Sequence, residues 1–253
     1  QDGNGDTKLG KIGDVVENII EKGESKQIET DIEGVYNPQI KVFAFDKNLK
    51  CVWSDVTIAA RKVSPKSLYK IETKSGRGVT VTKDHCLVTI KDGKVIMTKG
   101  EDIKTGSYIP LTREIKNIQS HNNYNLTDSH LILLGLVTSE GHIDNRVAIY
   151  NTDKDVLDTI VNCSSNLELP ISPLHLAGSK TIIKGYYFRS KDFLNLVNKI
   201  GGGGRSGDKR VPSPIFGLSN PEVSQYLKAY YEGDGGVEQH EITATTKSRM
   251  LAS

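Results

Sequence analysis

The sequence predicts a mixed fold, with an all-β region over residues 1–112 followed by an α+β region over residues 129–253. In the first region, short runs of alternating apolar residues are separated by turns rich in Gly, Asn and Asp. The second region combines longer helical patterns with a few strand-like runs. Residues 113–128 between them are polar and rich in Asn, which is typical of a linker.

The elements of both regions follow from these patterns. Residues 11–20, KIGDVVENII, predict a helix with Asp14 as its N-cap. Thr127 and Asp128 are expected to cap a second helix that begins near Ser129. Strands are expected at 41–46, 51–58, 68–73, 79–82, 87–90, 95–97, 146–150 and 181–189, with hairpin turns at 47–50 and 91–94. Further helices are expected at 152–161 and 190–197.

One pattern of the α+β region occurs twice, as LLGLVTSEG over residues 133–141 and as LKAYYEGDG over residues 227–235. Positions four apart share a helix face, so Gly135 with Ser139, and Ala229 with Gly233, form two stripes of small side chains. Two helices lined in this way can approach more closely than the usual distance of roughly 8–10 Å. The repeat therefore predicts a tight helix–helix interface.

Each copy ends in an acid followed by glycine, and the offset between Glu140 and Asp234 is 234 − 140 = 94 residues. Gly141 and Gly235 suit the left-handed residue that ends many helices. Both carboxylates then fall in a last helical turn, where the helix dipole disfavours negative charge, and paired helices bring them into mutual repulsion. Mg²⁺ or Mn²⁺ between the acids relieves that repulsion, which predicts metal-assisted phosphodiester cleavage. One copy alone is better explained by a core helix with a glycine cap, but two copies with the same acid placement favour a site.

Both copies resemble the LAGLIDADG motif of homing endonucleases, also called the dodecapeptide or DOD-type motif. Glu140 replaces the usual Asp in the first copy, and Tyr230-Tyr231 replaces aliphatic residues in the second. The resemblance implies a half-domain of order αββαββα and the start of a second half, in a monomer with pseudo-two-fold symmetry. It also implies that Glu140 and Asp234 hold Mg²⁺ or Mn²⁺ in one active site that cuts double-stranded DNA.

Candidate DNA-binding residues lie in the basic segment 171–210, although the net charge of the chain is only +2. An ordinary solvated face is the alternative for this segment. Gly201–Gly204 predicts a flexible hinge that orders on DNA, or an ordinary loop. The candidates are Lys180, Lys184, Arg189, Arg205, Lys209 and Arg210.

The all-β region contains Thr82-x-x-His85 within the run LYKIETKSGRGVTVTKDHCLVTIKDGKV, and GEDIKTGSYIPLTR follows. These runs resemble the N-terminal splicing region of an intein, which has the horseshoe-like Hint fold, and KIGDVVENII resembles an early helix of many archaeal inteins. The resemblance implies that Thr82 and His85 drive an N–S or N–O acyl shift at the junction with a flanking host segment, an extein. His85 has the chemistry to protonate the scissile amide nitrogen, and Asp84 can orient the loop.

The two ends of the chain depart from the intein pattern. Inteins begin with Cys or Ser, but residue 1 is Gln and the first such residue is Ser25, so we expect the nucleophile upstream. A less favoured alignment places Asp2 at that position. After Ser253 we expect the remaining second half and a closing His-Asn pair. The alternatives are a degenerate DNA-binding LAGLIDADG protein without cutting or splicing, and a Hint processing module that does not splice.

The composition places the chain among globular intracellular proteins, and we expect a cytoplasmic location. Its three cysteines, Cys51, Cys86 and Cys163, are scattered and odd in number, which favours reduced thiols. Their spacing excludes the usual zinc patterns with histidine. The polar start differs from a signal peptide, and no apolar run is long enough for a membrane span, so no membrane partner is expected.

Overall fold

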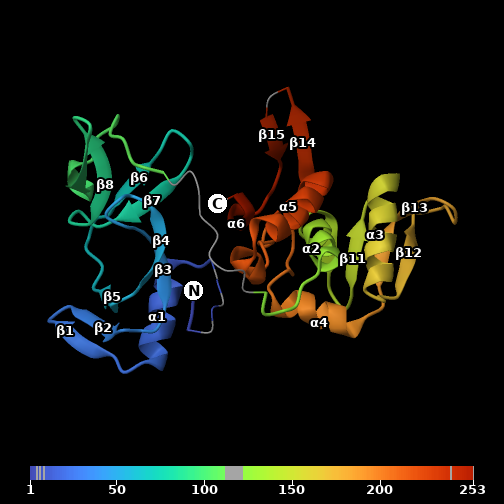
Figure 1. The fold of residues 1–253 in the computed structure, drawn as a ribbon, viewed down its shortest axis with the longest axis horizontal. Helices are drawn as coiled ribbons and strands as arrows, with labels where there is room; N and C mark the ends of the chain where they lie inside the picture. The colour runs from blue at the N-terminus through green and yellow to red at the C-terminus, as the bar shows by residue number, and fades with distance from the viewer. Residues whose placement is uncertain (4, 6, 8, 112–121, 240, 253) are drawn as a thin grey trace. The chain divides into compact units, whose positions relative to one another are not determined.

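The computed structural model describes residues 1–253 except Asn4, Asp6, Lys8, 112–121, His240 and Ser253. The chain forms two compact units (Figure 1). The β unit comprises Gly10–Lys116, and the helical unit comprises Asn117–Ser253 together with Gln1–Leu9. Helices and strands occur together in this chain, so the predicted mixed fold is confirmed at that level.

The β unit begins with a helix and continues as short antiparallel strands. Its elements are α1 (Ile12–Lys22), β1 (Lys26–Glu29), β2 (Ile32–Tyr36), β3 (Lys41–Phe45), β4 (Cys51–Asp55), β5 (Ile58–Lys62), β6 (Tyr69–Glu72), β7 (Gly78–Val81), β8 (Cys86–Lys91), β9 (Lys94–Lys99) and η1 (Gly100–Asp102). Strands β1, β2 and β5 form one sheet, and the others form the hairpins β3–β4, β6–β7 and β8–β9. Asp92 and Gly93 both have positive φ in the β8–β9 turn, as Asp-Gly hairpin turns require.

The expected cap of α1 is wrong. The helix begins at Ile12, and Lys11 occupies the N-cap position in an extended conformation without a side-chain cap. The chain becomes helical before Asp14, which therefore lies inside the first turn. There its charge complements the positive end of the helix dipole instead of capping the helix.

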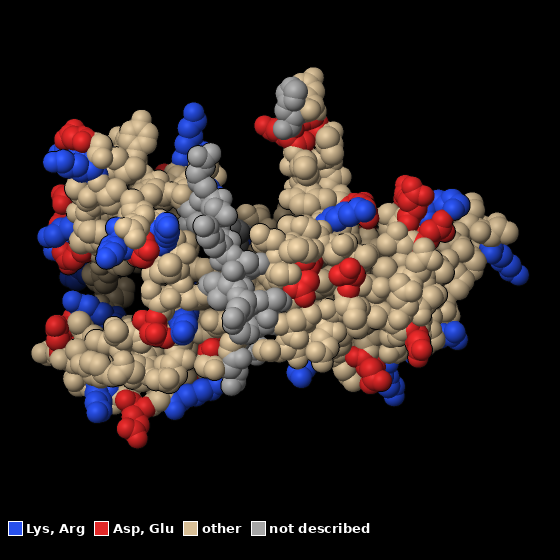
Figure 2. Space-filling model, viewed as in Figure 1, with Lys and Arg blue, Asp and Glu red and all other residues tan. Residues whose placement is uncertain are grey.

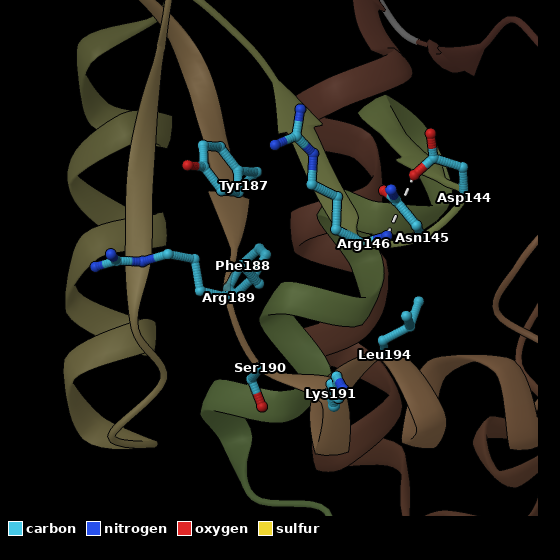
Figure 3. Close-up of a pocket in the computed structure, with 9 residues that line it drawn as sticks. All are labelled: Asp144, Asn145, Arg146, Tyr187, Phe188, Arg189, Ser190, Lys191 and Leu194. Atoms are coloured by element: carbon cyan, nitrogen blue, oxygen red, sulfur yellow. Dashed lines mark hydrogen bonds between the residues drawn. The ribbon is translucent and has the colours of Figure 1, made fainter.

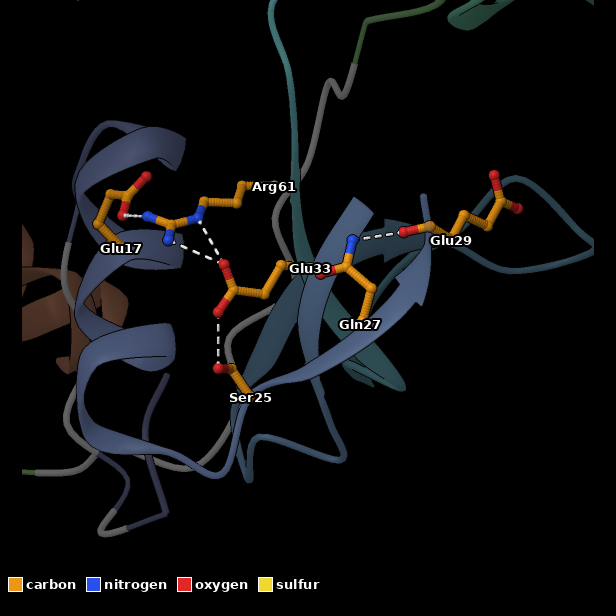
Figure 4. Close-up of polar contacts among 6 residues, drawn as sticks. All are labelled: Glu17, Ser25, Gln27, Glu29, Glu33 and Arg61. Atoms are coloured by element: carbon orange, nitrogen blue, oxygen red, sulfur yellow. Dashed lines mark hydrogen bonds and ion pairs between the residues drawn. The ribbon is translucent and has the colours of Figure 1, made fainter. Parts of the chain in front are cut away.

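Arg61 on β5 ties α1 to the three-stranded sheet (Figure 4). Its guanidinium donates one hydrogen bond to the carboxylate of Glu17 on α1. It donates another, of 2.8 Å, to the carboxylate of Glu33 on β2. Hydrogen bonds from Ser25 and from Arg61 lower the pKa of Glu33 below its ordinary value. Because these groups are exposed, the network fixes the orientation of α1 more than it adds stability.

The β unit has a small core for its size. Among its described residues, the buried apolar side chains are Ile20, Ala59 and Val81. Phe43 stacks on Trp53 across the β3–β4 hairpin at 3.9 Å between ring centroids, yet Phe43 is 42% exposed. Many of the strands therefore keep one apolar face in contact with solvent.

The helical unit is built around one buried helix. Its elements are α2 (Asp128–Glu140), β10 (Gly141–Ile143), β11 (Val147–Tyr150), α3 (Lys154–Asn166), β12 (Ile171–His175), β13 (Ile183–Phe188), α4 (Lys191–Lys199), η2 (Ser213–Gly217), α5 (Asn220–Asp234), β14 (Gly235–Glu238), β15 (Glu241–Ala244) and α6 (Arg249–Ala252). Helix α2 lies between α5 and β11 (Figure 1). It is apolar on all sides, and Leu131, Leu133, Leu134 and Leu136 are fully buried, as expected of a central helix.

The elements α2 to α4 follow the order α-β-β-α-β-β-α, and their strands form an antiparallel sheet of order β10-β11-β13-β12. The segments after α5 repeat its beginning. Strand β15 spans residues 241–244 and β11 spans residues 147–150, so the two strands are 244 − 150 = 94 residues apart in the sequence. The same displacement relates the ends of α2 and α5, so the sequence repeat is also a structural repeat.

Most of the predicted linker, 113–121, lies outside the described residues. The remainder packs against the helical unit. Asn122 exchanges side-chain hydrogen bonds with the backbone of Leu126 and also contacts Glu222 of α5, while Leu126 is buried in the core. As expected, Thr127 caps α2.

No helix in the described part of the chain combines the length and apolar character that a membrane crossing needs.

Candidate functional site

Helices α2 and α5 pack closely along the two predicted stripes of small side chains. A Cβ atom on Gly135 would lie 2.4 Å from the carbonyl oxygen of Tyr226 and 2.8 Å from Ala229 Cβ. A Cβ atom on Gly233 would lie 2.2 Å from Ser139 Oγ. Side chains at either glycine would therefore push the helices apart, as the stripe interpretation requires.

The expected left-handed conformation at Gly141 and Gly235 is wrong. Gly141 has φ −79° and ψ 151°, and Gly235 has φ −90° and ψ 158°, both extended. Each helix passes directly into a strand, β10 or β14. At this bend a Cβ atom would lie 2.2 Å from the carbonyl oxygen four residues earlier, of Val137 or of Tyr231. Glycine is required here for space rather than for a positive φ.

Glu140 and Asp234 end the two touching helices and interact electrostatically. Burial and then the negative charge of Asp234 raise the pKa of Glu140, while Lys209 lowers it. Burial also raises the pKa of Asp234, and Lys209 again opposes the shift. A Cβ atom on Gly233 would lie 3.0 Å from Glu140 Cγ, so the last turns of α2 and α5 are in contact. The two acids therefore form one half-buried acidic site.

Lys209 contributes the positive charge of this site. Its Nζ donates a hydrogen bond of 2.6 Å to the carbonyl oxygen of Ser139, beside Glu140. Burial lowers the pKa of the Lys209 ammonium, whereas the charges of Asp234 and Glu140 raise it. The sequence placed Lys209 among the candidate DNA contacts. Its approach to the acids depends on tertiary packing of the loop between α4 and η2, which no local spacing indicates.

The donor chemistry of this site fits a hard divalent cation. Within the described residues no group of three or more His, Cys, Asp or Glu side chains gathers to hold a metal. This site offers two acidic donors, Glu140 and Asp234. Mg²⁺ is commonly bound through one or two carboxylates, with water and phosphate oxygens completing its shell. Two half-buried carboxylates with raised pKa values also gain from a cation that offsets their repulsion.

The middle of the α2–α5 interface holds a buried polar contact. Tyr226 is 1% exposed, and its hydroxyl donates a hydrogen bond of 3.0 Å to Thr138 Oγ1. Thr138 in turn donates to the carbonyl oxygen of Leu134 at 2.8 Å. This chain of hydrogen bonds fixes the register of the two helices, and thereby the relative position of the acids at their ends.

A basic groove opens at one end of the four-stranded sheet (Figure 3). Arg146 lies over the ring of Tyr187, 4.1 Å from its centroid, in a cation–π contact. The groove has a volume of about 500 Å³ and is also lined by Arg189, Ser190 and Lys191. The guanidinium of Arg189 points away from Arg146, toward β12, where it donates to the carbonyl oxygen of Ile171 at 3.5 Å (Figure 3). Sequence reasoning identified Arg189 but missed Arg146, whose role depends on a strand distant in the sequence.

The other candidate DNA contacts lie apart from this groove. Lys184 Nζ is 5.6 Å from the centroid of the Tyr150 ring, and Lys180 is exposed in the connection between β12 and β13. Arg205 and Arg210 are exposed in the loop that carries Lys209. Figure 2 shows basic and acidic side chains interspersed over the face in view.

The glycine run before Lys209 packs in part against the end of α4. Gly202 is buried and donates a backbone hydrogen bond of 2.8 Å to Val197, and a Cβ atom there would lie 3.1 Å from Val197 Cγ1. Gly201 and Gly204 have positive φ, a conformation that glycine adopts readily because it has no Cβ atom. The packing of Gly202 agrees with the alternative of an ordinary loop, and the hinge that orders on DNA stays a prediction.

In the β unit, Thr82 and His85 lie at the two ends of a tight turn between β7 and β8. The amide of His85 donates to the carbonyl oxygen of Thr82 at 3.2 Å, and the amide of Gly100 donates to that of His85 at 2.8 Å. A Cβ atom on Gly100 would lie 2.9 Å from the Thr82 carbonyl oxygen. His85 and Asp84 are exposed on this turn. Gly100, which sequence reasoning did not single out, gives the turn its close backbone support.

No family model matches the chain. It is similar to two proteins of Methanocaldococcus jannaschii, a replication factor C small subunit (28% identical over 247 residues) and transcription initiation factor IIB (26% over 233 residues). These matches cover 92% and 91% of this chain but only 13% and 33% of those proteins. A DNA polymerase of Thermococcus sp. is 32% identical over 139 residues, which are 54% of this chain and 8% of that protein. Among solved structures, the transcription factor IIB Mvu mini-intein is similar at 28% identity, with a TM-score of 0.41, 44% of this chain and 63% of that chain covered.

Proposed function

We propose that this chain is part of an intein that carries a DNA endonuclease of the LAGLIDADG type. The observation that carries the nuclease proposal is the meeting of Glu140, Asp234 and Lys209 at the ends of two closely packed helices. Because the two helices belong to a sequence repeat, each copy supplies one acid to a shared site.

The comparisons support the intein part of the proposal. Proteins with different names, a replication factor C subunit, transcription initiation factor IIB and an RNA polymerase subunit, each match more than nine tenths of this chain. The matched segment is at most 33% of each of these proteins. A segment shared by proteins of such different roles is best explained as an element inserted into all of them, which is what the resemblance to inteins implies.

In the proposed nuclease, Glu140 and Asp234 would hold Mg²⁺ or Mn²⁺ with their carboxylate oxygens. Such a cation polarises a phosphodiester and supplies an activated water. The ammonium of Lys209 offsets part of the negative charge of the two acids and offers a hydrogen-bond donor for charge that develops on the phosphate oxygens. The tight α2–α5 interface keeps the two carboxylates at fixed positions, so little reorganisation of them accompanies the reaction.

The proposed partner of this site is double-stranded DNA. Tyr187 and Ser172, both partly exposed, are paired across adjacent strands on the sheet face opposite to the core residues Val147 and Ile149, although Ala148 on the same face is buried. A sheet face of this kind suits the major groove, and Arg146 and the other cations of the basic groove suit the phosphate backbone. Lys180, Lys184, Arg189, Arg205 and Arg210 remain proposed DNA contacts.

For the splicing part, we propose that Thr82 and His85 act on the peptide bond that joins the intein to the preceding extein. The turn that holds them leaves His85 exposed, where its imidazole is free to protonate a departing amide nitrogen. Thr82 is suited to hydrogen-bond the same peptide, and Asp84 to orient the loop.

Cleavage of DNA tests the nuclease proposal. The substrate is a duplex made by joining the two extein coding sequences that flank the complete intein in its gene. The protein should cut it only with Mg²⁺ or Mn²⁺, and Glu140→Gln or Asp234→Asn should lower the rate by about a thousandfold or more. Glu238→Gln, which changes an exposed acid on β14, is the matched control and should cut normally. Full activity in both site variants would contradict the proposed site, and binding without cutting by the unaltered protein would favour the degenerate DNA-binding alternative.

Scission of the gene product that contains this chain tests the splicing proposal. His85→Ala should slow cleavage at the upstream junction by about a hundredfold, since general acid catalysis typically contributes 10²–10⁴. Lys83→Ala alters the same turn without removing its imidazole and should have little effect. Equal rates for His85→Ala and the unaltered protein would remove His85 from the proposed mechanism, and the DNA cleavage assay would be unaffected by either result.

A further inference from the structure

Both backbone polar groups of Lys209, its amide and its carbonyl oxygen, are hydrogen-bonded, and Ser248 is the partner of the carbonyl oxygen. Ser248 lies at the start of α6, in the second copy of the repeat, and is 1% exposed. Its hydroxyl donates a hydrogen bond of 2.5 Å to the carbonyl oxygen of Lys209. The amide of Lys209 donates to the carbonyl oxygen of Arg205 at 3.0 Å. The backbone from which the Lys209 side chain reaches Ser139 is therefore fixed by two contacts.

The same hydroxyl also caps α6. Ser248 Oγ accepts from the amide of Met250 at 3.2 Å and from that of Leu251 at 3.4 Å. A hydroxyl donates one hydrogen bond and accepts others, so Ser248 serves both purposes at once. A carboxylate at this position would cap the helix but would have no proton to offer the Lys209 carbonyl.

The first copy of the repeat has a cap of the other kind. Asp153 precedes α3, and its carboxylate accepts from the amides of Asp155 and Val156 at 2.8 Å and 3.2 Å. Asp153 is exposed, and its side chain caps α3 through acceptors alone. The corresponding helix of the second copy therefore has a donor at its start, next to the carbonyl oxygen of Lys209.

We propose that Ser248 is a positioning residue, which holds the Lys209 ammonium beside Glu140 and Asp234. Through this contact the second copy of the repeat sets the position of a lysine that follows the first. The effect on DNA cleavage rests on the nuclease function proposed above, whereas the positioning of Lys209 is measurable without it.

The cleavage arm is a double-mutant cycle under single-turnover conditions with saturating DNA and Mg²⁺. Ser248→Ala should slow cleavage by about 10- to 100-fold with little change in DNA affinity, because a small displacement of a catalytic group is costly. Ser248→Thr keeps the hydroxyl and should restore the rate. In a Lys209→Met background, Ser248→Ala should have no further effect, since it acts through the lysine. If Ser248→Ala lowered the cleavage rate by the same factor in Lys209→Met as in the unaltered protein, the proposal would be overturned.

Asp153→Ala is the matched control, because it removes a helix cap of the same unit without touching Lys209. It should lower thermal stability and leave the cleavage rate within about twofold. Should Ser248→Ala fail to fold, Ser248→Gly replaces it, since glycine keeps most of the capping preference but has no hydroxyl.

The second arm is the NMR spectrum of the protein with ¹³C-labelled lysine, in which Lys209→Met assigns the Lys209 side-chain signal. The signal should lie apart from those of exposed lysines in the unaltered protein, in Ser248→Thr and in Asp153→Ala. In Ser248→Ala it should move into the exposed group. An unmoved Lys209 signal would refute the positioning role even if cleavage is slow. If the unaltered protein cuts no DNA, the nuclease proposal fails while this spectrum still decides the role of Ser248.

Discussion

A Cβ atom placed on Gly135 would lie 2.4 Å from the carbonyl oxygen of Tyr226, a backbone atom of the facing helix. It would also lie 3.0 Å from the amide nitrogen of Tyr230. Neither atom can rotate out of the way as a side chain could, so the distance between α2 and α5 at this level is set by the absence of a side chain at Gly135. The geometry of the acidic site at the helix ends depends on this approach.

Gly135→Ala should therefore destabilise the helical unit. Helix propensity alone would favour alanine by about 1 kcal/mol, but overpacking a rigid interface typically costs about 1–3 kcal/mol or more. We expect a net loss of about 2 kcal/mol in the free energy of unfolding, measured by urea denaturation with far-UV circular dichroism. Gly13→Ala in α1 is the control, since no neighbouring atom lies within 4 Å of its Cβ position, and it should be neutral or stabilising. Equal stability of the Gly135 variant and the unaltered protein would show that the helices separate freely.

Tyr226→Phe should cost about 1 kcal/mol, because it removes one buried hydrogen bond and leaves the ring in place. Thr138 keeps its bond to Leu134, so no donor is orphaned. The measurement is the midpoint of urea unfolding at neutral pH. Tyr231→Phe on the same helix removes a hydroxyl from a residue that is 39% exposed and should change the midpoint little. A Tyr226 variant as stable as the Tyr231 variant would mean that the contact does not fix the helix register.

Local sequence features predicted the elements whose causes are local. The Asp92-Gly93 turn, the alternating strands on either side of it and the helix before Glu140 all depend on residues close in sequence. The repeat went further, since the identical placement of small residues and acids in two helices indicated that the helices meet. A single copy predicts only a helix with small residues on one face, whereas two copies also predict which helix it packs against.

The features that the sequence did not reveal depend on contacts between distant residues. Lys209 reaches Ser139 across 209 − 139 = 70 positions, and Arg146 reaches the Tyr187 ring from another strand. Gly141 was expected to be left-handed because helices often end that way, but here the chain continues directly into β10. In each case tertiary packing, which a single sequence does not encode in any local spacing, decided the outcome.

The acids should make the metal-free protein less stable as pH rises. Glu140 and Asp234 both have a folded-state pKa above the ordinary values of 4.5 and 3.8. In the pH window just above those values, the folded chain binds more protons than the unfolded chain. The stability that the two protonated acids contribute is therefore fully present below their unfolded-state pKa values. It is lost as pH rises through their folded-state pKa values. Glu140→Gln should reduce this loss and raise the midpoint of thermal unfolding at pH 7 without Mg²⁺.

Mg²⁺ should reverse the ranking of these two proteins. A cation that binds only the folded state stabilises the unaltered protein by mass action. The Glu140→Gln variant keeps only one of the two site carboxylates, so Mg²⁺ should raise its unfolding temperature only slightly. Thermal unfolding with and without Mg²⁺ measures both effects, and Glu238→Gln serves as the control for an exposed acid. An identical response of Glu140→Gln and the unaltered protein to Mg²⁺ would place the cation elsewhere.

Arg146→Ala should weaken binding to duplex DNA of any sequence and reduce its dependence on salt. The guanidinium lies over Tyr187 at the wall of the basic groove, where the ring restricts its motion and the nearby Arg189 and Lys191 add to the positive potential. Loss of one phosphate contact should reduce the slope of log K against log salt by about 1. Lys154→Ala on α3 removes an exposed cation paired with Asp158, outside the groove, and should leave the slope unchanged. Fluorescence anisotropy over a range of salt concentrations distinguishes the two variants. Equal slopes for both would mean that the groove contacts no DNA phosphate and that the Arg146–Tyr187 pair serves only to hold the two strands together.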